Sequence, residues 1–118
     1  MSSIRDRIAA SDDRRRVTVD VPEWDVKIEL RSPTVRERGA LFDAHYSADG
    51  TIADPSRLAV DAVIACAYDP DTGEKVFTDD DVDFLYERSS VVLDRLAAAV
   101  TPLVSPTETD VDVGKGDS

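Results

Sequence analysis

Residues 16–31 read RVTVDVPEWDVKIELR and carry the clearest β-strand pattern in the chain. Apolar side chains occupy every second position on both sides of PEWD, a tetrapeptide short enough to close a hairpin. Such alternation places one face of each strand against a core and the other face in water. Pro22 cannot donate to a β-ladder and marks the turn, where Trp24 is expected to anchor the chain onto the core. The stretch therefore predicts a β-hairpin.

Helical patterns lie on both sides of this hairpin. Before it, Ser3 is expected to cap a short helix over residues 4–10. After it, apolar periodicity and capping residues predict helices near residues 34–46, 55–68, 79–88 and 90–100. The predicted fold class is α+β, with an N-terminal β-hairpin packed against a small bundle of about four helices over residues 1–104. Residues 105–118 are acidic, lack a core pattern and are expected to form a disordered tail.

The helix near 34–46 begins with Thr34 and Glu37, which have the spacing of a capping box. Gly39 costs about 1 kcal/mol relative to alanine inside a helix, which suggests a close contact with another helix or a weak turn. His45 is expected on the helix surface, because no nucleophile is linked to it in the sequence. The buried stripe is expected to consist of Val35, Leu41, Phe42 and Tyr46.

The helix near 55–68, which Asp54 is expected to cap, is apolar on nearly all sides and is interrupted only by Asp61. It is therefore expected to be central and buried, with Cys66 as an inert small hydrophobe. The last helix is expected to start at the cap Ser90. Pro102 disfavours helical geometry at the residue before it, so this helix should end or kink there.

Residues 69–84 read DPDTGEKVFTDDDVDF, and the run D-x-D-x-G resembles the opening of a calcium loop. Counted from Asp69, however, Gly73 and Glu74 fall where an EF-hand loop needs an oxygen ligand and a glycine. A turn followed by a helix start explains more of the letters, because glycine permits φ > 0 and Thr78 caps a helix whose first turn holds three aspartates. The sequence therefore predicts no calcium site, no zinc site and no cofactor.

Composition restricts the function further. The chain has 118 residues, a net charge of −11 and a sequence pI of about 4.3, so direct nucleic-acid binding is not expected. One cysteine and one histidine exclude an intramolecular disulfide and most nucleophile–base pairs. No phosphate-binding or dinucleotide-binding motif is present, so the protein is not expected to be an enzyme. With no apolar run of spanning length and no apolar signal segment, it is expected to stay in the cytoplasm.

The order of these segments resembles the tail assembly chaperones of long-tailed bacteriophages. The resemblance covers roughly residues 1–104 and rests on VPEWDVKIELR, on a P-T-x-x-E-R helix start, and on YDPDTGEKVFTDDD followed by a serine-rich helix start. One departure is Pro102, which is expected to shorten the last helix relative to the family.

This resemblance implies a non-enzymatic role. Such proteins are thought to coat the long tape measure protein before the tail tube forms, to keep its helical apolar surface from aggregating, and to help bring tail tube subunits. They act in the host cytoplasm and are absent from the finished virion. Several copies along one tape measure chain would gain strength from multivalency. The candidate contact residues are exposed apolar positions on the helices over 79–100, namely Tyr86, Val91 and Val92.

The family also commonly makes a longer product by a −1 ribosomal frameshift. Val113-Gly114-Lys115 can be written GTG GGA AAG, which contains the slippery heptamer G GGA AAG. The longer form would share residues 1–115. Its extra domain would be tethered by the flexible linker from Ser105 and would bring the major tail tube protein.

Two other functions stay open. The chain could be an acidic inhibitor that mimics DNA and binds a host protein, or a small hydrolase or metal-dependent enzyme. Gene neighbourhood separates them, because a very long helical reading frame just downstream indicates the chaperone and an isolated early gene indicates the inhibitor.

Overall fold

A three-stranded antiparallel sheet forms around the predicted hairpin in the computed structural model, which describes residues 3–104. β1 (Arg16–Val21) and β2 (Val26–Arg31) pair along their full lengths, so the predicted hairpin is confirmed. η1, the 3₁₀ turn Pro22–Trp24, joins them, and Asp25 completes the turn with a φ of 55°. β3 (Ala67–Tyr68), which the sequence did not predict, pairs with the other edge of β2.

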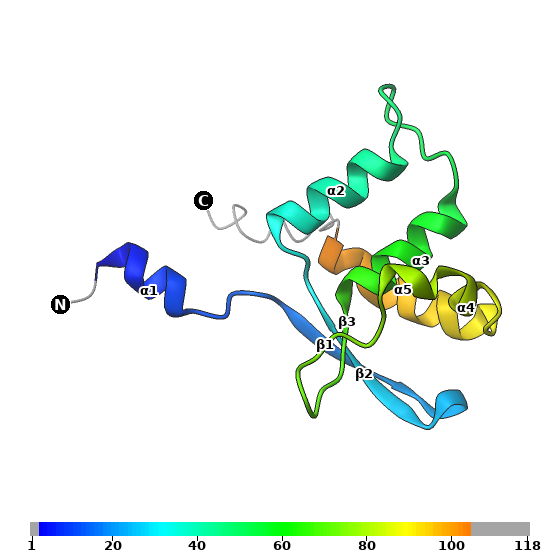
Figure 1. Cartoon of the computed structure of the whole chain (residues 1–118), viewed down its shortest axis with the longest axis horizontal. Helices are drawn as coiled ribbons and strands as arrows, with labels where there is room; N and C mark the ends of the chain where they lie inside the picture. Colours follow the sequence, from blue (N-terminus) through cyan, green and yellow to red (C-terminus); the bar gives the residue numbers. More distant parts are fainter. Residues whose placement is uncertain (1–2, 105–118) are drawn as a thin grey trace, which may run out of the picture.

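The remaining named elements are helical: α1 (Ile4–Ala10), α2 (Val35–His45), α3 (Pro55–Cys66), η2 (Asp79–Asp81), α4 (Val82–Tyr86) and α5 (Ser90–Val104). Figure 1 shows α2 to α5 gathered on one side of the hairpin, whereas α1 stands apart from them beyond the start of β1. No residue of α1 is buried. The predicted α+β class is thus confirmed. The predicted tail over 105–118 lies outside the described residues. Within residues 3–104, none of the helices is long and apolar enough to cross a membrane.

The hydrophobic core lies between the sheet, α3 and α5. α3 packs against α2, α4 and α5 and also contacts β2, so it is the central helix that its apolar sequence predicted. Trp24 packs half-buried against this core and anchors the hairpin turn as expected. The largest fully buried side chains are Leu30, Leu85, Leu96, Val21, Val63, Val92, Val100 and Cys66.

Side-chain caps fix the helix starts. Ser3, Thr34 and Thr78 each form a capping box with the acidic residue three positions on, and Asp54 accepts a hydrogen bond from the Arg57 N–H at 3.2 Å. These bonds satisfy N–H groups that have no partner inside a helix, so local sequence determines where the helices begin. α5 differs, because Ser90 is already its first helical residue and the Ser89 carbonyl accepts the bond from Leu93 N–H.

The predicted buried stripe of α2 was wrong at both ends. Leu41 is buried and Phe42 half-buried, but Val35 is 91% exposed and Tyr46 is exposed as well. Leu41 and the residue four positions later share one helix face, which places His45 rather than Tyr46 against the core. Of the two explanations offered for Gly39, the close contact with another helix is excluded, because a Cβ there would meet nothing within 4 Å.

The prediction that α5 ends before Pro102 was wrong. The helix continues to Val104 with Pro102 inside it, so the proline does not shorten it. The carbonyl that loses its N–H donor belongs to Ala98, which is exposed and open to water. Leu103 and Val104 are buried, so packing of the last turn offsets the missing hydrogen bond.

Candidate functional site

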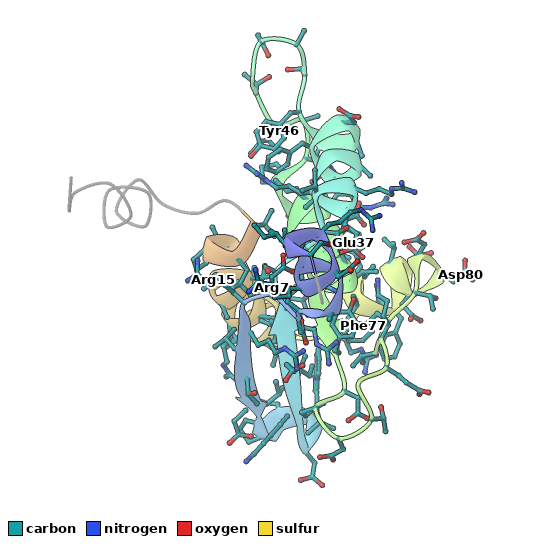
Figure 2. All side chains as sticks on the ribbon, turned by 90° about the vertical axis from the view of Figure 1, so that its left-hand side faces the viewer. Arg7, Arg15, Glu37, Tyr46, Phe77 and Asp80 are labelled. Atoms are coloured by element: carbon teal, nitrogen blue, oxygen red, sulfur yellow. The ribbon has the colours of Figure 1, made fainter. Side chains whose placement is uncertain are left out.

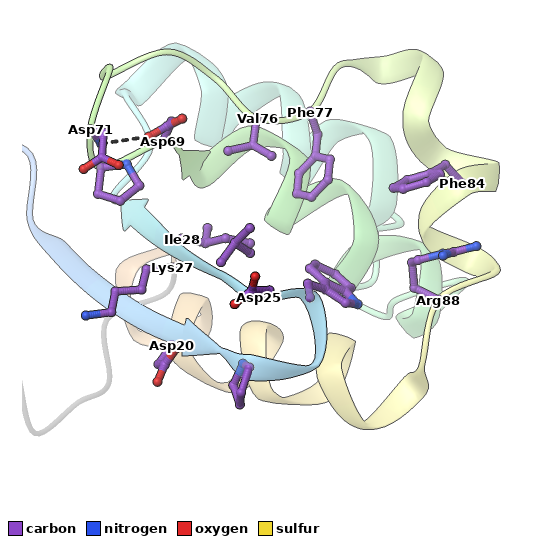
Figure 3. Close-up of a pocket in the computed structure, with 14 residues that line it drawn as sticks. Asp20, Asp25, Lys27, Ile28, Asp69, Asp71, Val76, Phe77, Phe84 and Arg88 are labelled. Carbon is purple, nitrogen blue, oxygen red and sulfur yellow. Dashed lines mark hydrogen bonds between the residues drawn. The ribbon is translucent and has the colours of Figure 1, made fainter.

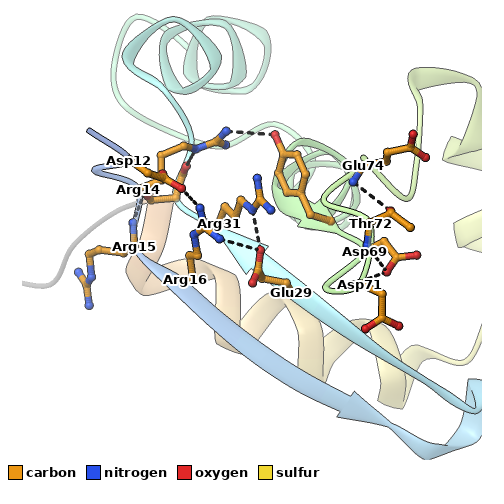
Figure 4. A network of polar contacts seen from close by, with 12 residues as sticks. Asp12, Arg14, Arg15, Arg16, Glu29, Arg31, Asp69, Asp71, Thr72 and Glu74 are labelled. Carbon is orange, nitrogen blue, oxygen red and sulfur yellow. Dashed lines mark hydrogen bonds and ion pairs between the residues drawn. The ribbon is translucent and has the colours of Figure 1, made fainter. Parts of the chain in front are cut away.

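The aspartates at residues 69–74 form a tight turn. The Asp69 carboxylate accepts hydrogen bonds from the N–H groups of Asp71 at 2.7 Å and Thr72 at 3.3 Å, while its backbone bonds to Gly73 and Glu74 close the loop (Figure 4). Gly73 has a φ of 77°, the conformation expected of it. Within residues 3–104 no three His, Cys, Asp or Glu side chains come together as metal ligands. The carboxylate that would start a calcium loop instead holds the turn.

The next three aspartates belong to a helix start. Thr78 accepts a bond from Asp80 N–H at 3.3 Å, and Asp81 accepts one from Thr78 N–H at 2.8 Å. η2 occupies this first turn and α4 follows it, so the predicted helix over 79–88 is shorter and starts as a 3₁₀ turn. Asp80 points away from the body of the protein (Figure 2). These carboxylates serve the helix end, where negative charge is favoured.

A groove of about 790 Å³ opens between the hairpin, the segment from Asp69 to Phe77, and α4. In Figure 3 the hairpin runs along one side of it and Val76 and Phe77 lie opposite. Phe84 and Arg88 lie at one end, and Asp69 and Asp71 at the other. The lining combines an apolar floor with a charged rim. Its apolar side chains are Trp24, Val26, Ile28, Val76, Phe77 and Phe84, and its acidic ones are Asp20, Asp25, Asp69 and Asp71.

The hairpin wall of this groove is tied to α5. Arg95 donates two hydrogen bonds to the Glu23 carboxylate, at 2.7 and 2.6 Å. These bonds lower the pKa of Glu23 from 4.5 to about 2. At the far end, the Arg88 guanidinium lies 4.8 Å from the Phe84 ring centroid. A bidentate pair and a cation–π contact therefore hold two sides of the groove.

An arginine cluster joins the chain before β1 to the sheet and to α2. Arg14 and Arg31 both lie against the Tyr68 ring, at 5.2 and 4.3 Å from its centroid. Arg14 also donates to Tyr68 Oη at 3.2 Å, and Arg31 donates to Glu29 at 2.6 Å (Figure 4). A further bond joins Arg14 to Glu37 at 3.3 Å. In the sequence, Arg14 belongs to a run of three arginines that shows no such partners. Its structural role depends on β3, which brings Tyr68 beside β2.

The expected position of His45 was wrong. It was expected on the surface, but it is 8% exposed and its Nε2 lies 2.7 Å from Asp61 Oδ2. Arg57 pairs with the same carboxylate at 3.1 Å. Asp61, the only charged residue in the apolar run from Leu58 to Cys66, is therefore the partner of the histidine. The three side chains connect α2 to α3. Nothing nucleophilic joins them among the described residues.

The predicted contact residues differ in exposure. Tyr86 is 43% exposed and Val91 is exposed, but Val92 is fully buried in the core and is not available to a partner. None of the three lines the groove, to which α4 contributes Phe84. The sequence missed the groove because its lining comes from segments about forty residues apart, although each segment was singled out separately.

The sequence and the fold were each compared with those of known proteins. No protein-family model matches the chain, and no curated protein matches it in sequence. The solved structure of the bacteriophage HK97 tail assembly chaperone is similar to it, with a TM-score of 0.61 and 23% sequence identity. The two chains share a fold. The similarity covers 88% of this chain and 100% of the HK97 chain, so it includes the whole of that protein.

Proposed function

We propose that the protein is a non-enzymatic tail assembly chaperone of a long-tailed bacteriophage. The observation that carries this proposal is the fold shared with the HK97 tail assembly chaperone over the full length of that chain. The independent resemblance of residues 1–104 to the same family supports it. In this role the protein coats the tape measure protein in the host cytoplasm before the tail tube forms and leaves before the virion is complete.

The surface chemistry suits this role. A net charge of −11 keeps a complex with an apolar partner soluble, since charged surfaces resist association. Exposed apolar side chains such as Val26, Val76 and Phe84 supply contacts for such a partner. Weak contacts repeated by many copies along one rod add up to strong binding. The partner thus binds the folded domain rather than residues 105–118.

A longer product made by a −1 frameshift at Val113-Gly114-Lys115 completes the proposal. Its additional domain would bring the major tail tube protein to the coated tape measure protein. Sequencing the gene tests this step, because Gly114 written GGC, or the absence of an overlapping −1 frame, excludes a slip at this position.

Co-expression tests the chaperone role. The long reading frame downstream of this gene is expressed alone, with the whole chain, and with a 1–104 truncation. We expect the tape measure protein to pellet when alone, and to stay soluble and co-purify with either form of the chaperone. A tape measure protein that pellets in all three cases contradicts the proposal, and solubility with the whole chain alone places the binding site in residues 105–118.

A further inference from the structure

We infer that the groove between the hairpin and α4 is the docking site for the partner, and that it takes a short apolar segment flanked by lysine or arginine. This inference rests on the proposed chaperone function and names the surface that performs it. The groove replaces Tyr86, Val91 and Val92 as the predicted contact surface.

The floor of the groove is an apolar surface that the chain leaves uncovered. Phe84 is 51% exposed, Val26 is 45% exposed and Val76 is 41% exposed, although each is large and apolar. Ile28 and Phe77, which also line the groove, are buried and belong to the core. Apolar side chains that gather in one groove with a polar rim are typical of a protein-binding site.

The rim determines the chemistry of the occupant. Four aspartates line the groove against two cations, Lys27 and Arg88, which leaves a local charge of −2. An apolar segment with basic flanks complements this rim, and a segment with acidic flanks is repelled. A second copy of this chain is disfavoured as the occupant, because each copy carries a net charge of −11.

The groove has the size and rigidity that binding requires. Its volume of about 790 Å³ lies within the ~300–1,000 Å³ range of known ligand pockets and has room for several anchoring side chains. The bidentate Glu23–Arg95 pair fixes the hairpin tip, and the capping box at Thr78 fixes the start of the helical segment that carries Phe84. Walls that are already ordered lose little entropy when a partner binds.

Trp24 gives a direct measurement of docking, because it is the only tryptophan in the chain and it lines the groove. The probe is a synthetic tryptophan-free peptide with leucines at helical spacing flanked by lysines, and its control carries glutamate in place of lysine. We expect the lysine peptide to shift the Trp24 emission saturably and to bind more weakly as salt rises. No binding, or equal binding of the glutamate peptide, overturns the inference.

Matched variants locate the contact. Phe84→Ala removes an exposed apolar side chain of the groove and should weaken the binding of the lysine peptide by about tenfold. Tyr86→Ala is its control, since Tyr86 is similarly exposed on the same helix but does not line the groove. Asp25→Asn combined with Asp71→Asn should weaken binding and reduce its salt dependence, and asparagine tolerates the positive φ at position 25. Circular dichroism confirms that each variant is folded.

Two further outcomes separate this inference from the proposed function. In the co-expression assay, we expect Phe84→Ala to lose the tape measure protein and Tyr86→Ala to retain it. If both variants retain the tape measure protein, the groove is not its docking site, while the chaperone role stands. If the wild-type chain does not keep the tape measure protein soluble, the proposed chaperone role is contradicted, and the peptide experiment alone tests the groove. A peptide of residues 3–11 contains α1 of this chain together with its two caps. If it binds more tightly than the lysine peptide, the inference is overturned and the groove is assigned to a second copy of the chain.

Discussion

The pair of buried His45 and half-buried Asp61 is the clearest consequence of the fold for single residues. Asp61→Ala leaves the His45 ring nitrogen buried without its partner, so we expect the free energy of unfolding to fall by about 1–3 kcal/mol. Urea denaturation measures the change. Asp43→Ala, on the exposed face of α2, should change stability by less than about 0.5 kcal/mol. Equal stability of the two variants would show that the pair is not formed.

Cys66 gives a second prediction at this scale. Its thiol is fully buried, and burial raises its pKa from 9.0 to about 11. At pH 8 the native protein should therefore react with a thiol reagent many times more slowly than the unfolded chain, because the thiolate is the nucleophile. The rate is followed by absorbance with and without urea. A native rate equal to the unfolded rate would contradict the placement of Cys66.

The Glu23–Arg95 pair predicts a pH dependence. Because its folded-state pKa of about 2 is below the ordinary 4.5, Glu23 contributes stability that is present above pH 4.5 and is lost as the pH falls toward about 2. Arg95→Leu removes the hydrogen bonds and should return the pKa of Glu23 toward 4.5. Carboxyl chemical shifts in an NMR titration measure this directly. An unchanged pKa in the variant would place the guanidinium elsewhere.

At the scale of the elements, two glycines predict opposite effects of one substitution. Gly39 lies inside α2 with open space around it, so Gly39→Ala should stabilise the protein by about 0.5–1 kcal/mol. Gly73 holds the turn with a φ of 77°, so Gly73→Ala should destabilise it by about 1–2 kcal/mol. Thermal unfolding measures both. The same sign for both substitutions would contradict either the helix or the turn.

The elements that sequence predicted are those whose cause is local. The hairpin follows from alternation around PEWD, and the capping boxes at Thr34 and Thr78 follow from residues three positions apart. β3 has only two residues and exists because α3 delivers it to the free edge of β2, which no local pattern reveals. Pro102 was misjudged for a related reason, since tertiary packing of α5 outweighs the local preference.

The candidate site was less predictable than the fold. Trp24 was expected to anchor the hairpin turn, but its meeting with Phe77 and Phe84 in one groove depends on the register of the sheet and the length of the 69–77 turn. The buried His45 was missed because its partner lies on another helix. Its signal was Asp61, the only charged residue in the otherwise apolar middle of α3.

At the scale of the whole molecule, the charge of the chain and the groove serve the same role. In the proposed function, the acidic surface would keep the protein and its cargo in solution, and the groove would supply the apolar contact. α1 lies outside this body with Ile4 and Ile8 exposed, so it is not needed to build the groove. The proposed function requires that the protein by itself holds an aggregation-prone partner in solution.

Light scattering of purified components tests that claim most directly. Unfolded tape measure protein is diluted into buffer with increasing amounts of the whole chain, and scattering is followed over time. We expect scattering to fall with each addition and to be suppressed at a fixed ratio of copies to partner, with Phe84→Ala less effective than Tyr86→Ala. Scattering that stays as high as with an equal amount of an unrelated acidic protein would contradict it.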